Sequence, residues 1–153
     1  MFRNLGNGRF ADATEHAGAV FKNHDVSRGA AFGDVDNDGD TDVVVANNSG
    51  PIRLLINHVG SRRHWVGIRV LGRQPRDMVG ARVGIIRATG PTLWRRARAD
   101  ASYASANDPR VLVGLGETQK ISKVRVEWPG GTAEEWTDVP VDRYTTLKEG
   151  EGR

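Results

Sequence analysis

The sequence contains no cysteine, which excludes a disulfide scaffold, a zinc site built from thiolates and a cysteine nucleophile. It also lacks an apolar run near the roughly 18 residues that a membrane-spanning helix needs, so no membrane span is expected. Several sequence motifs of well-known chemistry are missing as well. We find no phosphate-binding P-loop, no Gly-x-Ser-x-Gly nucleophile motif and no dinucleotide-binding fingerprint.

The composition is that of an ordinary globular protein, since 38% of the 153 residues are hydrophobic and 27% are charged. A chain of this length forms one domain or two small ones. Residues 1–60 carry five Lys and Arg against eight Asp and Glu, whereas residues 61–153 carry 17 against 11. This asymmetry predicts two units with different surfaces. A basic half can bind nucleic acid, but its arginines are spread over many expected strands, which favours a solvated surface and argues against nucleic acid as a partner.

Alternating polar and apolar residues, interrupted by frequent turn residues, predict an all-β chain. Residues 15–23 are expected to form one helical turn or a loop, and the β-branched run Val43–Val45 is expected to be buried on both faces of its sheet. Composition and charge shift at residues 58–62, which predicts one unit at 1–60 and a small antiparallel β-sandwich-like unit at 61–153. The expected strands are 9–14, 28–33, 41–47, 52–57, 64–70, 81–87, 92–98, 111–115, 121–128, 132–136 and 144–148.

The strongest signal is an aspartate loop at residues 34–42, where five of the twelve aspartates of the chain lie within nine residues. These charges would repel one another in a folded loop, and a hard divalent cation removes that repulsion. Calcium takes about six to eight oxygen ligands, and loops supply them from alternate positions. Gly39 permits the sharp bend that the loop requires. We expect the metal ligands to be the side chains of Asp34, Asp36, Asp38 and Asp42 and the backbone carbonyl of Asp40, whose side chain would point away.

The loop opens like that of an EF-hand but departs from it in two ways. Val45 stands where an EF-hand has a bidentate glutamate, and a β-branched strand follows in place of a helix. Asp42 is therefore expected to be the last side-chain ligand, in place of that glutamate. Magnesium fits less well because it requires a tight octahedron of ligands. A solvated acidic turn without an ion is the alternative, and a bound ion could be structural or could also hold a ligand.

Two parts of the sequence resemble a known family. Residues 32–43, FGDVDNDGDTDV, resemble an FG-GAP/VCBS repeat, the calcium-binding blade unit of integrin-type β-propellers, and residues 4–14 resemble the strand that closes the preceding repeat. The later residues resemble the ASPIC/UnbV domain that follows such repeats in the cartilage acidic protein-like family. The matching segments are His64–Arg69, Gly80–Val83, Ser102–Tyr103, Ser105–Arg110, Gly114–Gly116 and Val124–Gly131.

This resemblance implies a partial β-propeller-type blade followed by a β domain, in a calcium-binding, non-enzymatic module for adhesion-type interactions. It also implies a protein that is secreted, periplasmic or at the cell surface. Met1–Asn4 opens the chain without the apolar core of a signal peptide, and too few strands are present for a full propeller. We therefore expect a fragment whose upstream blades lie outside this sequence, with Ca²⁺ as its cofactor and an extracellular protein or glycan as its partner.

Histidines, tryptophans and one loop of the second unit are further candidates for binding chemistry. The four histidines, at positions 16, 24, 58 and 64, show no metal-binding spacing and are interpreted as surface or boundary residues. The loop at 105–110 is the best candidate for a functional loop in the second unit, although an Asx-type turn before Pro109 is the favoured interpretation. The four tryptophans could stack on sugars, and a polysaccharide-binding or polysaccharide-processing accessory domain is the alternative function. Packing in the core and at its edges is the simpler explanation for them. No catalytic residue is expected.

Overall fold

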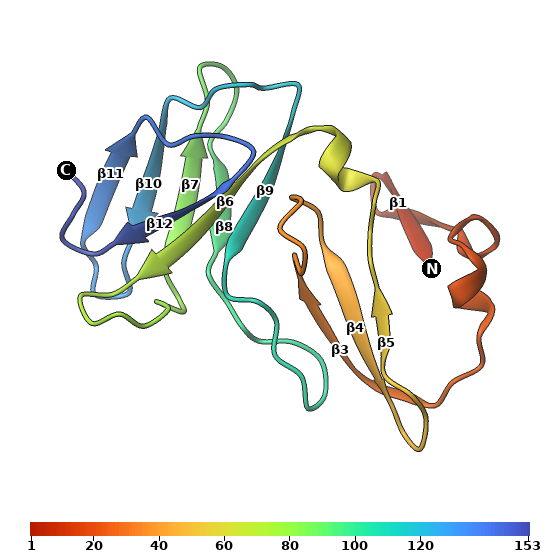
Figure 1. Ribbon diagram of the computed structural model, residues 1–153. Coiled ribbons are helices and arrows are strands. Elements are labelled where there is room, and N and C mark those ends of the chain that lie inside the picture. Colours follow the sequence, from red (N-terminus) through yellow and green to blue (C-terminus); the bar gives the residue numbers. More distant parts are fainter.

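The computed structural model describes residues 1–153 and contains twelve β-strands and three short 3₁₀ turns, with no α-helix. The prediction of an all-β fold is therefore confirmed. The strands fall into two parts, β1–β5 and β6–β12, which lie next to each other (Figure 1). None of the helical segments is long and apolar enough to cross a membrane.

The first part consists of a hairpin and a three-stranded antiparallel sheet of order β3-β4-β5. Asn7 and Gly8 form the tight turn of the hairpin with φ angles of 53° and 70°, as their residue types predict. Residues 15–23, expected to form a helical turn or a loop, lie largely in two 3₁₀ turns, η1 (Thr14–His16) and η2 (Ala19–Lys22). The strands are β1 (Phe2–Gly6), β2 (Arg9–Asp12), β3 (Ser27–Gly33), β4 (Asp42–Asn47) and β5 (Arg53–Leu55).

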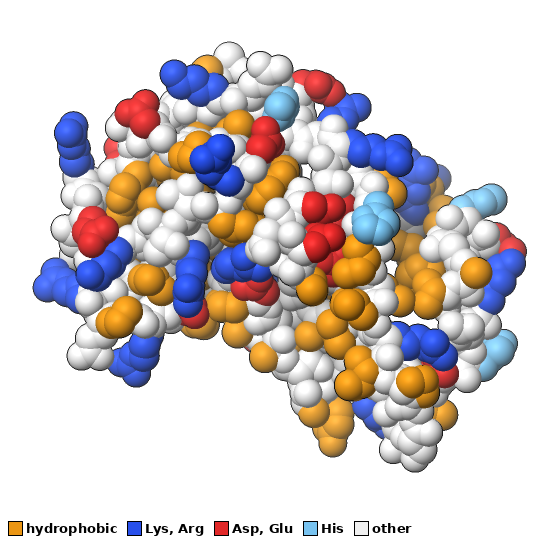
Figure 2. All heavy atoms as spheres, in the orientation of Figure 1, with side chains coloured by type: hydrophobic (Ala, Val, Ile, Leu, Met, Phe, Trp, Pro, Cys, Tyr) orange, Lys and Arg blue, Asp and Glu red, His pale blue; other side chains and the backbone are white.

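The central strand of this sheet is less buried than expected. Val43, Val44 and Val45 are only half-buried, so the prediction that both faces of this strand are buried is wrong. No second layer covers the sheet, and apolar side chains on it, such as Phe32 and Leu54, are exposed, as is Ile52 just before β5. Hydrophobic side chains are visible over this part of the surface in Figure 2.

The second part forms the expected small sandwich from two sheets. One sheet, of order β11-β10-β7-β8, is antiparallel throughout. In the other, of order β12-β6-β9, strand β9 is antiparallel to β6 but β12 runs parallel to it. Alternation does not record strand direction, so this parallel pair was not foreseen. The strands are β6 (His64–Leu71), β7 (Arg82–Ile86), β8 (Leu93–Arg96), β9 (Val111–Gly116), β10 (Lys123–Glu127), β11 (Ala133–Thr137) and β12 (Tyr144–Lys148).

The hydrophobic core belongs to the second part. Sixteen buried residues form one cluster, and every one of them lies between Val66 and Leu147. Val66 and Ile68 from β6 and Val124 and Val126 from β10 belong to this cluster, and all four are fully buried. Burying one such side chain stabilises a protein by roughly 1.5–3 kcal/mol, so this cluster dominates the stability of the fold.

The tryptophans pack within and around this core. Trp65 and Trp128 are 6% and 3% exposed, and Trp136 packs edge-on against Trp128 with ring centroids 6.2 Å apart. The guanidinium group of Arg82 lies 4.8 Å from the ring centroid of the half-buried Trp94. The four rings thus form no exposed platform for a sugar, and packing accounts for them as the simpler interpretation predicted.

Two segments join the parts. The short turn η3 (Gly60–Arg62) leads from the first part directly into β6. The long connection between β8 and β9 turns back and runs alongside β3 (Figure 1). There the Phe32 amide donates to Asn107 Oδ1 and the Asp108 amide donates to the Phe32 carbonyl, both at 2.9 Å. Because β3 is an edge strand, this connection occupies hydrogen-bonding groups that would otherwise face solvent.

Candidate metal centre

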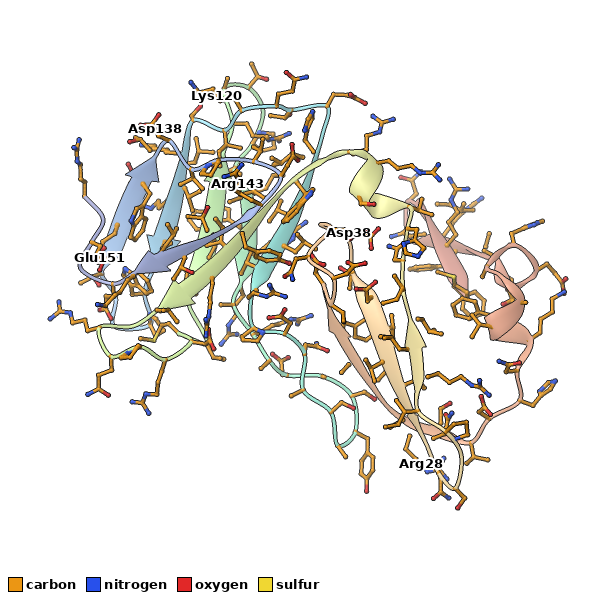
Figure 3. All side chains as sticks on the ribbon, in the orientation of Figure 1. Arg28, Asp38, Lys120, Asp138, Arg143 and Glu151 are labelled. Atoms are coloured by element: carbon orange, nitrogen blue, oxygen red, sulfur yellow. The ribbon has the colours of Figure 1, made fainter.

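The aspartate loop connects β3 to β4, as the sequence predicts. Gly33 and Asp42 are register partners at the ends of these strands, so Asp34 and Asp42 leave the sheet side by side. Between them the chain reverses with positive φ angles at Asn37 (62°) and Gly39 (95°). In Figure 3 the labelled Asp38 marks this loop at one end of the sheet, opposite the end marked by Arg28.

Three of the five predicted ligands converge. Carboxylate oxygens of Asp34, Asp36 and Asp42 all lie within 4.8 Å of one another, and Asp34 and Asp42 are buried. Asp42 accepts hydrogen bonds from the amides of Val35 (2.8 Å) and Asn57 (2.9 Å). The backbone therefore fixes the position of this carboxylate and leaves further lone pairs on both oxygens.

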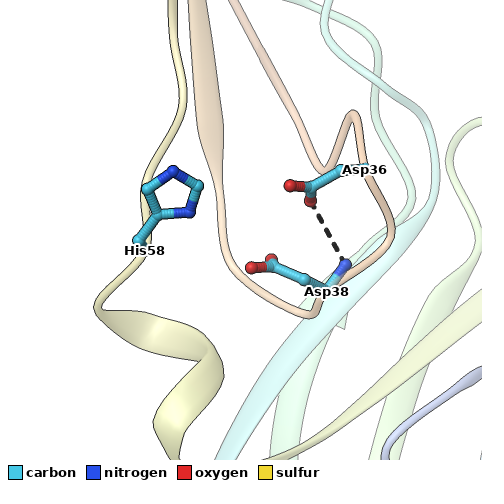
Figure 4. Close-up of side chains that lie close together, drawn as sticks. All are labelled: Asp36, Asp38 and His58. Atoms are coloured by element: carbon cyan, nitrogen blue, oxygen red, sulfur yellow. Dashed lines mark hydrogen bonds between the residues drawn. The ribbon is translucent and has the colours of Figure 1, made fainter.

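Asp38 joins a second, overlapping group. Oxygens of Asp36 and Asp38 lie within 4.8 Å of a ring nitrogen of His58, which is exposed on the segment after β5 (Figure 4). The Asp38 amide donates to Asp36 Oδ1 at 3.4 Å and to Asp34 Oδ1 at 3.1 Å, so the loop is also tied together internally. Figure 2 shows a group of acidic side chains beside a histidine on this face of the molecule. His58 was interpreted as a boundary residue, and its place next to the loop could not be read from spacing.

Among the five predicted ligand residues, Asp40 is the one whose carboxylate belongs to neither converging group. Its side chain is 4% exposed, and its Oδ2 accepts a hydrogen bond from the Ser61 amide at 3.1 Å, in the turn that leads to the second part. Its Oδ1 is buried without a hydrogen-bond partner. Burial raises the pKa of this carboxyl group, and the Ser61 amide only partly offsets the effect. The side chain thus lies among protein groups and not in solvent.

The donor set suits a hard cation. Two oxygens bound to one calcium ion at about 2.3–2.6 Å can be separated by no more than about 5 Å, and the carboxylates of Asp34, Asp36 and Asp42 meet this limit. All three supply oxygen, the donor that calcium prefers over nitrogen or sulfur. Buried carboxylates facing each other are unfavourable without a compensating positive charge. The residues present therefore fit a calcium ion.

Two side chains of the second part hold the loop from outside. The Tyr144 hydroxyl donates to Asp34 Oδ2 at 2.9 Å, and burial together with this hydrogen bond raises the pKa of Tyr144. Arg110 donates to the Asp34 carbonyl (2.8 Å), to Asn37 Oδ1 (2.6 Å) and to Asp108 Oδ2 (2.6 Å). Its guanidinium carbon lies 4.0 Å from the centroid of the Tyr144 ring.

The tip of the loop also packs against the second part. A Cβ atom placed on Gly39 would lie 2.1 Å from the ring of Trp65, so only glycine fits this contact. Trp65 in turn packs edge-on against Tyr144, with ring centroids 5.3 Å apart. The metal loop is therefore part of the contact between the two parts.

The loop at 105–110 has a structural role here. The polar groups of this loop form hydrogen bonds to β3, to the aspartate loop and within the loop itself, through Asn107, Asp108 and Arg110. Asn107 Nδ2 also donates to the Asp100 carbonyl at 2.9 Å. Sequence reasoning selected this loop but missed its partner, because contacts between distant segments leave no periodic signal. Nothing in the sequence around Tyr144 indicated that its side chain contacts the aspartate loop.

The remaining histidines form no metal cluster. His16 and His24 are exposed, in agreement with their interpretation as surface residues. His64 Nδ1 lies 2.7 Å from Asp142 Oδ2 at the start of β6. Burial alone would raise the pKa of Asp142, but hydrogen bonds from the His64 ring and the Trp65 amide lower it. This pair positions the connection before β12.

Comparison with known proteins agrees with the resemblance. The family model described as "FG-GAP-like repeat" matches residues 1–45, and the one described as "ASPIC and UnbV" matches residues 72–153. A 56-residue segment is 43% identical to "Cartilage acidic protein 1" of Mus musculus and to its counterpart from Homo sapiens. That segment is 37% of this chain but only 8% of the length of either relative.

Both predicted family resemblances are confirmed by these matches, in the predicted order. The matched ranges lie within the predicted units 1–60 and 61–153, whose boundary stays a prediction. The second match covers more than half of the 153 residues, and the protein therefore belongs to the ASPIC and UnbV family, with an FG-GAP-like repeat preceding that domain.

Proposed function

We propose that this chain is a calcium-binding, non-enzymatic interaction module of an extracellular or cell-surface protein, in which the ion stabilises the β fold. The observation that carries the proposal is the convergence of the Asp34, Asp36 and Asp42 carboxylates within 4.8 Å. Asp38 would complete the side-chain ligands, and Asp40 would contribute its backbone carbonyl. The ion supplies positive charge at the centre of five acidic residues, and the chain supplies oxygen donors.

The location and the partner are inferred from the family. An FG-GAP-like repeat and a segment similar to a cartilage protein both support a place outside the cell. The uncovered sheet β3-β4-β5, with its exposed apolar side chains, is what a blade would present to neighbouring blades, and we propose that such blades lie upstream. The binding partner is proposed to be an extracellular protein or glycan.

Calcium binding is tested by thermal unfolding with calcium and with a chelator. A ligand at about 100 times its dissociation constant stabilises the folded state by about 2.7 kcal/mol, so calcium should raise the melting temperature by several degrees. The Asp36→Ala variant should lose this rise. Asp100→Ala is the matched control, because the Asp100 side chain is 75% exposed and outside the loop, and it should keep the full rise. The absence of a calcium-dependent shift in the unmodified chain would refute the proposal.

The His58 cluster offers a competing metal, because imidazole with two carboxylates suits zinc and other transition metals. The His58→Gln variant separates the two possibilities. If calcium is the ion, its affinity should be unchanged in this variant, since calcium takes oxygen ligands. A site that responds to zinc alone and fails in His58→Gln would replace calcium as the assignment.

A further inference from the structure

A polar cleft of about 260 Å³ lies where the two parts of the molecule meet, and Asp34 and Thr41 of the metal loop are among its lining residues. The end of β3 and Thr41 form one side, and the end of β8 and the start of β9 form the other. Strand β8 is the edge of its sheet, so no strand of that sheet lies between its end and the cleft. Arg95, Arg96 and Arg98 all line it.

These three arginines lack the close ion pairs that arginines make elsewhere in the molecule. Arg69, Arg82 and Arg53 hold carboxylates at 2.6–2.9 Å. In contrast, no carboxylate lies within ion-pairing distance of Arg95 or Arg96, and the nearest to Arg98 is that of Asp100 at 3.8 Å. Three arginines thus line one cleft without a close carboxylate partner, and Arg95 Nη1 donates to the Trp94 carbonyl at 2.9 Å.

The acidic groups of the cleft are already engaged. Asp108 accepts two hydrogen bonds from Arg110, one from its amide at 2.9 Å and one from Nε at 2.6 Å. Asp34 accepts from Tyr144 and from the amides of Asp38 and Gly39. The lining holds four arginines, Arg110 included, against two aspartates, so its charge balance is positive, and Thr41 also lines the cleft.

We propose that this cleft binds an oxyanion, the sulfate, phosphate or carboxylate group of a soluble ligand, through Arg95, Arg96 and Arg98. A guanidinium group presents paired N–H donors whose spacing matches two oxygens of such a group, and several guanidinium groups around one cavity match its charge. The cleft is polar and open to solvent, which suits the charged end of a ligand more than an apolar body. This site goes beyond the proposed calcium function: its three arginines lie outside the metal loop, and Asp34 and Thr41 of that loop line the same cleft.

The test is a titration followed by the Nε–H signals of ¹⁵N-labelled arginines, in buffer with calcium and at ionic strength held constant with sodium chloride. Inorganic sulfate, inorganic phosphate and acetate are the probes, together with glucose 6-sulfate and glucose 6-phosphate. At least one anion should produce saturable shifts of the Arg95 and Arg96 signals. Tighter binding of the sugar ester than of the free ion would show that a larger ligand carries the group, and equal binding would identify the free ion as sufficient.

Variants decide whether the arginines hold the anion. Arg95→Gln and Arg96→Gln should each weaken binding by about tenfold, the effect of losing one charge-assisted hydrogen bond. Both residues are exposed, so the melting temperature without anion and the calcium response should stay unchanged. Arg125→Gln is the control, since Arg125 pairs with Glu135 and Glu127 on another part of the sheet, and it should bind as tightly as the unmodified chain. Shifts that do not saturate, or equal affinities in all three variants, would overturn the proposal.

Discussion

The Tyr144 hydroxyl donates a 2.9 Å hydrogen bond to Asp34 Oδ2 across 110 positions of sequence. Asp34 follows the edge strand of the first part, and Tyr144 begins the last strand of the second. A buried carboxylate of the metal loop is thus positioned by the other half of the chain. Occupancy of the loop and contact between the two parts are for this reason expected to support each other.

Tyr144→Phe should lower the free energy of unfolding by about 1–2 kcal/mol, because it removes one hydrogen bond to a charged group and keeps the ring in place. Urea unfolding measures the change. Tyr103→Phe is the control, since Tyr103 is 75% exposed, and its effect should stay within about 0.5 kcal/mol. Equal effects of the two substitutions would show that the Tyr144 hydroxyl has no role in holding the loop.

Asp42 and Asp36 should differ when calcium is absent. Asp42→Ala leaves the amides of Val35 and Asn57 without acceptors in a buried position, and we expect a loss of about 2–4 kcal/mol in a chelator. Asp36 is exposed and accepts only one long hydrogen bond, of 3.4 Å. Asp36→Ala should therefore change stability by less than about 0.5 kcal/mol under the same conditions. Chemical unfolding with a chelator checks both, and similar losses would argue against a structural role specific to Asp42.

Gly39→Ala should destabilise the chain by about 3 kcal/mol. Its φ of 95° is unfavourable for any residue with a side chain, and the added Cβ would collide with the Trp65 ring. Gly130→Ala is the matched control, because no atom lies within 4 Å of a Cβ at that turn position. Differential scanning calorimetry on both variants tests the contact. A mild effect at Gly39 would mean that the loop does not pack on Trp65 in solution.

Acid should weaken the link between β6 and the connection that follows it. Asp77 accepts two hydrogen bonds from Arg69, at 2.7 and 3.2 Å, and these lower the pKa of the Asp77 carboxyl. A lowered pKa means that the carboxylate stabilises the fold above the unfolded value of about 3.9, and that this contribution is lost as pH falls through the folded value. Asp77→Asn should thus reduce stability at neutral pH, and this reduction should shrink as pH falls below about 3.9. Urea unfolding at several pH values tests this. A difference in unfolding free energy between the variant and the unmodified chain that does not change with pH would contradict it.

Local patterns predicted much of this structure. Alternation in β6 and β10 located strands whose inward residues, such as Val66 and Val124, are fully buried. The turn at Asn7 and Gly8 and the bend at Gly39 were predicted because few residue types tolerate positive φ. The aspartate loop was recognised because alternating carboxylates around a glycine are a local pattern. All of these features depend on residues close together in sequence.

Features that depend on distant residues were not predicted. The hydrogen bonds of Arg110 to Asp34 and Asn37 join segments more than 70 positions apart. The burial of Asp40 follows from its contact with Ser61, which spacing within the loop cannot reveal. The burial of Val43–Val45 was overestimated for a related reason. The β-branched residues of a strand indicate that burial would be favourable, but they do not show whether another part of this chain packs over the strand.

The parallel pairing of β12 with β6 has a consequence during synthesis. Strand β6 lies between β9 and β12, and Gly67 is the register partner of Leu112 on one side and of Tyr144 on the other. On the ribosome, β6 and β9 emerge well before β12, so one edge of β6 stays open until residues 144–148 have been translated. An open strand edge can pair with other chains, and closing it over so long a separation is slow. The interval before β12 docks is therefore when pairing of the open β6 edge with other chains competes most with folding.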